Sequence, residues 1–210
     1  MVTIIDLDIG NLHSVANAFR RIGAQVSVAT TASEAAGAHI LVLPGVGAFE
    51  RGMANLHARG FGPLITRHAV ERRAPLIGIC LGMQLLADRS YEHGTTAGLG
   101  LIAGDVIRLE PGSSAERVPN IGWKPVDASR PSALFPARID GQSFYHVHSY
   151  HLACSNATDV AATIAFGGRR IVTAVQRENI FGVQFHPEKS QDAGLDLLSS
   201  LLLHFENRTH

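Results

Sequence analysis

Apolar positions in the first half of the chain alternate between short runs and helical stripes. The runs of strand length are Val2–Asp6, Gln25–Val28, Ile40–Leu43 and Leu76–Ile79. Between them, apolar residues recur at helical spacing, as in Asn11–Ile22, which Gly23 closes. Strands that alternate with helices predict a parallel sheet with right-handed crossovers. Sites in such sheets form at the carboxyl ends of the strands.

The pattern changes after a polar, turn-rich connection at Glu110–Pro119. Short alternating strands are expected at Gln142–Val147, Val160–Phe166, Ile171–Gln176 and Ile180–Phe185. A final helix is expected from about Ser190. We therefore expect an α/β fold: a three-layer sandwich with a mainly parallel central sheet and a mostly antiparallel second half. Without a repeat or a long linker, residues 1–210 are expected to form a single domain.

Composition narrows the function classes. The chain has 210 residues with a formal net charge of zero, so neither nucleic acid nor an anionic membrane is expected as the main partner. The N-terminus lacks the pattern of a signal peptide, and no run approaches the ~18 apolar residues of a membrane span. These features favour a cytoplasmic setting. A disulfide between the two cysteines, Cys80 and Cys154, is then not expected.

Cys80 lies in the run Pro75–Leu86, which reads as a short strand, a sharp turn and a helix. Gly78 and Gly82 flank it with the spacing of a nucleophile elbow. Residues without a Cβ let the strand and the helix pass closely beneath the turn, and the amides of the helix favour the thiolate. The alternative is a buried structural cysteine, because free cysteine commonly packs as a small hydrophobe.

A base for this thiol is expected at the end of the last strand. His186 and Glu188 are two residues apart, and Pro187 between them favours an extended backbone. Side chains at this spacing lie on one face, so the carboxylate can reach the imidazole. Together with Cys80 they supply a nucleophile, a base and an orienting carboxylate. The alternative for this segment is a surface turn with a salt bridge.

Two blocks, Gly78–Leu86 and Gly182–Ser190, resemble the signatures of the class I glutamine amidotransferases, whose glutaminase domains use a Cys-His-Glu triad. Other blocks are similar to one branch of that family, the glutaminase subunits of imidazole glycerol phosphate synthase in histidine biosynthesis. They are Asp6–Val15, Pro44–Phe49, Gly122–Trp123 and Phe144–Tyr150. The resemblance covers essentially the whole chain. It implies a flavodoxin-like class I amidotransferase fold and hydrolysis of L-glutamine to glutamate and ammonia.

The resemblance also implies roles for individual residues. The oxyanion hole is assigned to the Leu81 N–H and to the loop around Val46 and Gly47, whose glycines permit a peptide flip. The implied substrate-binding residues are Gln84, Glu92, His148, Ser149 and Tyr150, the last three through backbone groups. Without the resemblance, Gln84 reads as an ordinary helix residue and Glu92 as a solvated loop charge.

The implied partner is a (βα)8-barrel cyclase subunit in a heterodimer. It joins the ammonia to a phosphorylated ribulosyl-aminoimidazole carboxamide nucleotide, giving imidazole glycerol phosphate and an aminoimidazole carboxamide ribotide. Positions that match the partner-facing ones are Asn11, Asn120, Trp123, Tyr145 and Lys189. A lone tryptophan beside a glycine equally fits a core residue, whereas at an interface it is a typical anchor.

Four positions near the expected interface depart from the family pattern: Asp8, Asn120, Lys124 and His146. Asp8 stands where glycine is usual, so the first loop is expected to differ. Asn120 replaces a common histidine, Lys124 a common asparagine and His146 a usual phenylalanine. These departures concern the partner contacts more than the triad.

Two other interpretations compete with this one. His146, His148 and His151 cluster near Cys154, and a shared strand face makes the first two a possible pair of metal ligands. The triad is also shared with other amidotransferase subunits, such as those of anthranilate or aminodeoxychorismate synthase. No cofactor is expected, because the sequence has no P-loop and no Gly-x-Gly-x-x-Gly after a strand.

Overall fold

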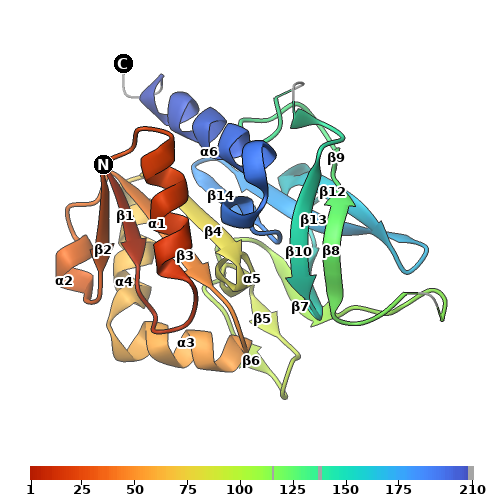
Figure 1. The fold of residues 1–210 in the computed structure, drawn as a ribbon. Coiled ribbons are helices and arrows are strands. Elements are labelled where there is room, and N and C mark those ends of the chain that lie inside the picture. Colours follow the sequence, from red (N-terminus) through yellow and green to blue (C-terminus); the bar gives the residue numbers. More distant parts are fainter. Residues whose placement is uncertain (115, 137–138, 208–210) are drawn as a thin grey trace.

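A twisted eight-stranded sheet forms the centre of the computed structural model, which describes residues 1–114, 116–136 and 139–207 (Figure 1). Its strand order is β2-β1-β3-β4-β14-β13-β12-β9. The first five of these strands run parallel and the last three pair antiparallel, as predicted. The α/β class and the antiparallel second half are therefore confirmed.

The central sheet contains β1 (Val2–Ile5), β2 (Val26–Ala29), β3 (Ile40–Gly45), β4 (Leu76–Cys80), β9 (Asp127–Ala128), β12 (Val160–Phe166), β13 (Arg169–Arg177) and β14 (Ile180–Val183). The helices are α1 (Leu12–Arg21), α2 (Ala32–Ala35), α3 (Phe49–Ala58), α4 (Phe61–Thr66), α5 (Leu81–Leu85) and α6 (Gln191–Glu206). Shorter turns are the π-helical η1 (Arg67–Glu71) and the 3-10 helices η3 (Ala157–Asp159) and η4 (Pro187–Lys189).

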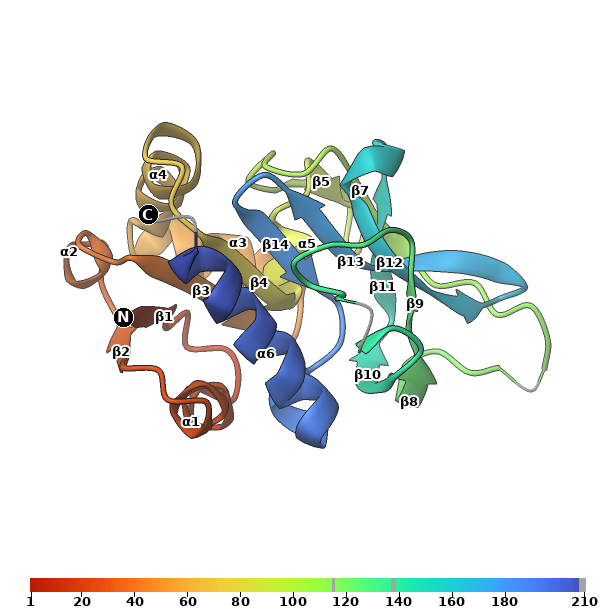
Figure 2. The same ribbon diagram turned by 90° about the horizontal axis from the view of Figure 1, so that it is seen from above.

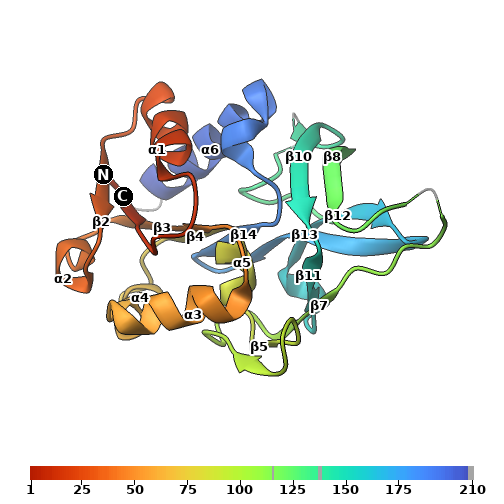
Figure 3. The ribbon, with the colours of Figure 1, turned by 60° about the horizontal axis from the view of Figure 1, so that its bottom comes forward.

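Alternation along the parallel strands gives the sheet two separate cores. In β1, Val2 and Ile4 pack with α1 and α6, whereas Ile5 packs with α3 and α4 on the opposite face. Figures 2 and 3 show α1 and α6 on one side of the sheet and α3 and α4 on the other. Both faces are covered, which explains the continuous apolar runs of β3 and β4.

Two smaller sheets flank the antiparallel half. One pairs β8 (Asn120–Pro125) with β10 (Ser143–His148), and the other has the order β11-β7-β5-β6. Its strands are β5 (Arg89–Ser90), β6 (Thr96–Ala97), β7 (Gly104–Arg108) and β11 (Tyr150–Cys154). The sequence patterns predicted β10 but missed β7, β8 and β11. In β8, the apolar residues Ile121 and Trp123 lie on the exposed face of the strand. The strand therefore lacks the pattern of apolar residues turned toward the core.

The predicted turn at Pro44–Gly47 begins later than expected. Pro44 and Gly45 still belong to β3, and Gly45 pairs in register with Cys80 of β4. The strand therefore carries the start of the loop directly to the cysteine. Only Val46 and Gly47 leave the sheet, and Gly47 has a φ of 101°, a conformation that favours glycine.

The first loop holds Asp8 in a left-handed conformation with a φ of 58°. The Asp6 carboxylate accepts a hydrogen bond from the Asp8 N–H at 2.7 Å, a local turn that aspartate forms readily. This contact explains how the loop accommodates an aspartate in place of the usual glycine.

Among the helices that the structure describes, none is long and apolar enough to cross a membrane.

Replacing Gly82 with alanine is expected to disrupt the turn at Cys80. A Cβ at Gly82 would collide with the Leu43 carbonyl group of β3, and the backbone on both sides leaves no room to relax. We expect a loss of at least about 3 kcal/mol in unfolding free energy, the upper end for overpacking, measured by urea denaturation. The matched control is Gly37→Ala, where a Cβ meets nothing within 4 Å. Equal stability of the two variants would show that the backbone at residue 82 can accommodate a Cβ, contrary to this prediction.

Candidate active site

Cys80 lies at the junction of β4 and α5 with a φ of 55° and a ψ of −110°. A non-glycine residue with positive φ is strained, and such strain concentrates at functional sites. A Cβ at Gly78 would lie 2.8 Å from backbone atoms of Gly82 and Met83, so the strand and the helix are packed against each other below the turn. The buried thiol, 5% exposed, is thus held at the carboxyl end of the parallel sheet.

His186 and Glu188 form a buried pair next to this turn. The His186 Nδ1 atom lies 2.7 Å from the Glu188 Oε1 atom, and each side chain is 3% exposed. Because Nδ1 is engaged by the carboxylate, Nε2 is the nitrogen available to Cys80. Nε2 and Glu188 Oε2 are both buried without a hydrogen-bond partner in the described part of the chain.

The charge state of His186 follows from its surroundings. Burial lowers its pKa, but the Cys80 thiol and the Glu188 carboxylate raise it more strongly, to about 9. Among the described residues, Nε2 and Cys80 Sγ do not form a hydrogen bond of ordinary geometry. At neutral pH the ring is therefore an imidazolium between a carboxylate and a sulfur atom.

Gln184 is a member of this site that the sequence analysis did not assign. It follows β14 directly, is fully buried, and donates a hydrogen bond from Nε2 to the Cys80 sulfur at 3.8 Å. It lies two residues before His186, the spacing that places side chains of an extended segment on one face. That spacing was the available signal, but a glutamine in a strand is not distinctive enough to be assigned a role.

The residues expected to form an oxyanion hole lie next to Cys80. Leu81 is the first residue of α5, and Val46 and Gly47 follow the Gly45 residue that pairs with Cys80. Val46 is 41% exposed, so this edge of the site is open to solvent. A small void of about 20 Å³ separates Val46 from His186, Glu188 and Lys189.

The expected substrate-binding residues surround the same turn. Gln84 is buried one helical turn after Cys80 and donates a hydrogen bond to the Tyr150 carbonyl oxygen at 3.0 Å. The Tyr150 hydroxyl in turn donates to the Glu92 carbonyl oxygen at 3.3 Å. The Glu92 carboxylate accepts from the Phe49 N–H at 2.7 Å, where α3 begins beyond the Val46 loop. Ser149 separates β10 from β11, and its carbonyl oxygen accepts from Leu109.

The histidine cluster is built as a packed polar core. His146 contacts the Phe144 carbonyl oxygen at 2.9 Å and the Thr173 hydroxyl at 2.8 Å, so both ring nitrogens are engaged. Burial lowers the pKa of His146 to about 4 and that of His148 to about 3. Both rings are therefore neutral at pH 7. The Nδ1 atom of His151 contacts the Leu152 carbonyl oxygen at 3.2 Å.

The metal-site alternative does not fit this geometry. Within residues 1–114, 116–136 and 139–207, no group of three or more His, Cys, Asp or Glu side chains is arranged to hold a metal ion. Cys154 is turned toward the Asn156 carbonyl oxygen at 3.3 Å, and burial raises its pKa. The cluster predicted from spacing is thus a set of hydrogen-bonded core histidines.

Four of the five residues expected to face a partner lie at one edge of the site. The Trp123 and Tyr145 rings meet edge to face at 6.2 Å, and the Lys189 Nζ atom lies 5.9 Å from the centre of the Tyr145 ring. Asn11 and Lys189 line the same small void. Asn120 differs, because it is only 2% exposed and its amide lies 3.1 Å from His148 Nε2.

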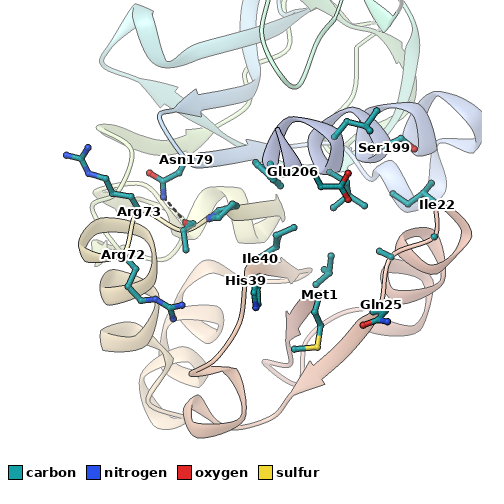
Figure 4. A pocket seen from close by; sticks show the side chains of 18 residues that line it. Met1, Ile22, Gln25, His39, Ile40, Arg72, Arg73, Asn179, Ser199 and Glu206 are labelled. Atoms are coloured by element: carbon teal, nitrogen blue, oxygen red, sulfur yellow. Dashed lines mark hydrogen bonds between the residues drawn. The ribbon is translucent and has the colours of Figure 1, made fainter. Parts of the chain in front are cut away.

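A cavity much larger than this void lies away from the site. It measures about 800 Å³ and lies at the opposite end of the sheet, where β1 and β3 begin (Figure 4). Its lining includes Met1, Ile40, Arg72 and residues near the end of α6. The described residues that line it include none of the triad, so its size does not indicate the chemistry.

Comparison with known proteins agrees with this geometry. A family model described as "Glutamine amidotransferase class-I" matches residues 3–204. The imidazole glycerol phosphate synthase subunit HisH of Chlorobium chlorochromatii is 44% identical over 95% of this chain and 98% of its own length. The HisH subunit of Moorella thermoacetica is 44% identical over 100% of this chain and 99% of its own length.

A solved structure supports the fold at lower similarity. The crystal structure of a putative GMP synthase subunit from Thermoplasma acidophilum matches with a TM-score of 0.73 at 20% identity. The match covers 99% of this chain and 94% of that one. The flavodoxin-like α/β fold predicted from the sequence is therefore confirmed. Taken together, the matches show that this chain belongs to the class I glutamine amidotransferase family, in its branch of imidazole glycerol phosphate synthase HisH subunits.

Proposed function

We propose that this chain hydrolyses L-glutamine to glutamate and ammonia through Cys80, His186 and Glu188. The observation that carries the proposal is the buried His186–Glu188 pair beside a cysteine held at a positive φ. A structural cysteine needs neither the strained turn nor a charged histidine next to it. The combination supplies a nucleophile, an acid–base group and the carboxylate that orients it.

The geometry supports the following sequence of steps. The Cys80 thiolate attacks the carbonyl carbon of the substrate side-chain amide, and the oxyanion that forms accepts hydrogen bonds from the Leu81 N–H and the Val46–Gly47 loop. His186 then gives its Nε2 proton to the leaving nitrogen, and ammonia departs from a glutamyl thioester. His186 next takes a proton from water, which attacks the thioester and releases glutamate. Glu188 keeps Nδ1 protonated throughout.

The substrate is oriented by the groups around the turn. Glu92 lies beside the start of α3, and its second carboxylate oxygen is assigned to the substrate ammonium. Gln84 is assigned to glutamine recognition, and the backbone of His148, Ser149 and Tyr150 is assigned to the substrate carboxylate. These contacts would place the side-chain amide over Cys80, so that reaction becomes effectively intramolecular.

The ammonia is proposed to pass to a (βα)8-barrel cyclase subunit in a heterodimer. Support comes from the relatives, which are named as subunits of imidazole glycerol phosphate synthase. We assign the complex to histidine biosynthesis, as a lyase. The products of the complex would be imidazole glycerol phosphate and an aminoimidazole carboxamide ribotide.

The surface around Trp123, Tyr145, Lys189 and Asn11 is assigned to the partner. Channelling would protect ammonia from protonation by water, and a cytoplasmic setting would keep Cys80 reduced.

Cys80→Ala is expected to abolish glutamine-dependent synthesis by the complex while synthesis from added ammonia continues. The alanine variant lacks the nucleophile but keeps the fold that contacts the partner. Release of glutamate and formation of the ribotide product are measured separately. Cys154→Ala is the matched control, because Cys154 lies away from the triad and is expected to be dispensable. Glutamine-dependent turnover by Cys80→Ala would overturn the nucleophile assignment.

The His186–Glu188 pair predicts a stability that falls in alkali. The pKa of His186 is about 9 in the folded protein and about 6.5 when unfolded, so the folded state binds an extra proton between these values. The contribution of the pair is therefore complete below about pH 6.5 and is lost as the pH rises through about 9. Its ceiling is roughly 3 kcal/mol.

Urea unfolding on both sides of this pH window measures the effect. The wild-type protein should lose more stability with rising pH than His186→Gln, which cannot titrate. Parallel pH profiles for the two proteins would show that His186 is not held in its charged form.

Trp123→Ala is expected to weaken partner binding about tenfold to a hundredfold, because a half-exposed tryptophan is typical of the residues that dominate interface energy. Trp123 is 46% exposed on β8. Val70→Ala is the control, since Val70 is 53% exposed on η1. Binding to the cyclase subunit is measured by titration calorimetry. Similar affinities for the two variants would exclude the β8 surface as the interface.

A further inference from the structure

A chain of buried hydrogen bonds leads from the main chain of Tyr150 to the sulfur of Cys80. Gln84 Nε2 donates to the Tyr150 carbonyl oxygen at 3.0 Å and to Gln184 Oε1 at 2.9 Å. Gln184 Nε2 donates to Cys80 Sγ at 3.8 Å. The proposed triad accounts for neither of these two glutamines, although both are buried.

The direction of this chain is fixed by chemistry. A carbonyl oxygen can only accept, so the Tyr150 carbonyl oxygen requires the NH₂ group of Gln84 to face it. The second N–H of the same group then meets Gln184, which must present its oxygen. The NH₂ group of Gln184 is consequently left for Cys80. An N–H donor, and not an amide oxygen, therefore faces the sulfur.

The far end of the chain is anchored as well. His148 Nδ1 lies 2.8 Å from the same Tyr150 carbonyl oxygen, and its Nε2 lies 3.1 Å from the Asn120 amide. A neutral His148 donates from Nδ1 and accepts from Asn120 at Nε2, and burial keeps it neutral. Two donors on one carbonyl oxygen hold the acceptor that fixes the orientation of Gln84.

We propose that Gln184 is a thiolate-stabilising residue, whose side-chain N–H is aimed at Cys80 Sγ by Gln84 and the Tyr150 carbonyl group. The proposal rests on the proposed role of Cys80 as the nucleophile. A hydrogen bond to a charged acceptor is shorter and stronger than one to a neutral acceptor. The 3.8 Å contact is long for a bond to a thiol and is expected to tighten once the sulfur is ionised. Gln184 then supplies a fixed donor where water is largely excluded.

The test measures the reactivity of Cys80 without any glutaminase turnover. In a Cys154→Ala background, Cys80 carries the only thiol, and its rate of alkylation by iodoacetamide is followed as a function of pH. Gln184→Met removes the donor with little change in volume. We expect the midpoint of the pH profile to rise by about one unit, the equivalent of one charge-assisted hydrogen bond. Gln184→Glu places a carboxylate at the sulfur and should raise it further.

Gln84→Met tests the orienting step. Loss of the Gln84 donor frees the Gln184 amide to rotate, so a smaller rise in the midpoint is expected. Thr173→Val is the matched control: Thr173 is fully buried on β13 and its hydroxyl contacts His146, not Cys80. This variant should lose stability through a buried hydrogen bond but leave the midpoint unchanged.

Three results would overturn the proposal. They are an unshifted midpoint in folded Gln184→Met, an unshifted midpoint in Gln184→Glu, and an equal shift in Thr173→Val. If Gln184→Met does not fold, Gln184→Glu and Gln84→Met decide the question. Because alkylation requires no catalysis, this outcome is independent of whether Cys80→Ala abolishes glutamine hydrolysis. Failure of the proposed function and failure of the Gln184 assignment are thus distinguishable.

Discussion

The close passage of α5 against β3 is the constraint on which the rest of the site depends. Gly82 approaches the Leu43 carbonyl group so closely that no Cβ fits, and Gly78 is packed against the backbone of α5. These contacts force the chain to turn sharply at Cys80 and hold its φ at a positive value. The sulfur thereby emerges at the carboxyl edge of the sheet, next to the segment that follows β14. The roles proposed for His186 and Glu188 depend on that position.

The parallel half of the fold and the proximity of the residues proposed as a triad could be predicted because their signals are local. Continuous apolar runs, two symmetric glycines and a His-Pro-Glu segment each carry a physical reason within a few residues. The strands β7, β8 and β11 could not be predicted in this way, because pairing and exposure outside the main sheet decide their patterns. Gln184 and the inward turn of Asn120 depend on neighbours far away in the sequence. The same holds for the histidine cluster, whose spacing suggested metal ligands and whose partners are a hydroxyl, an amide and carbonyl groups.

Three neighbouring histidines show how partner type decides charge. His146, His148 and His186 are all buried, and burial alone lowers the pKa of each. His186 faces a carboxylate and a thiol, which stabilise a cation more than burial opposes it. His146 and His148 face neutral groups, which do not offset the cost of burying a charge. One protonated ring is therefore placed among neutral ones, and in the proposed mechanism it is the ring that gives its Nε2 proton to the leaving nitrogen.

The attachment of the β8–β10 sheet has a consequence for how such enzymes diversify. These two strands form a sheet of their own, apart from the central one. The sheet is tied to the segment of His186 through the His186 N–H, which donates to the Tyr145 carbonyl oxygen, and the Ser190 hydroxyl, which accepts from the Tyr145 N–H. Both contacts use main-chain atoms of Tyr145, so they are insensitive to the side chains that the β8–β10 sheet displays. Evolution can thus rewrite the outer face of this module for a different synthase while the histidine keeps its anchorage.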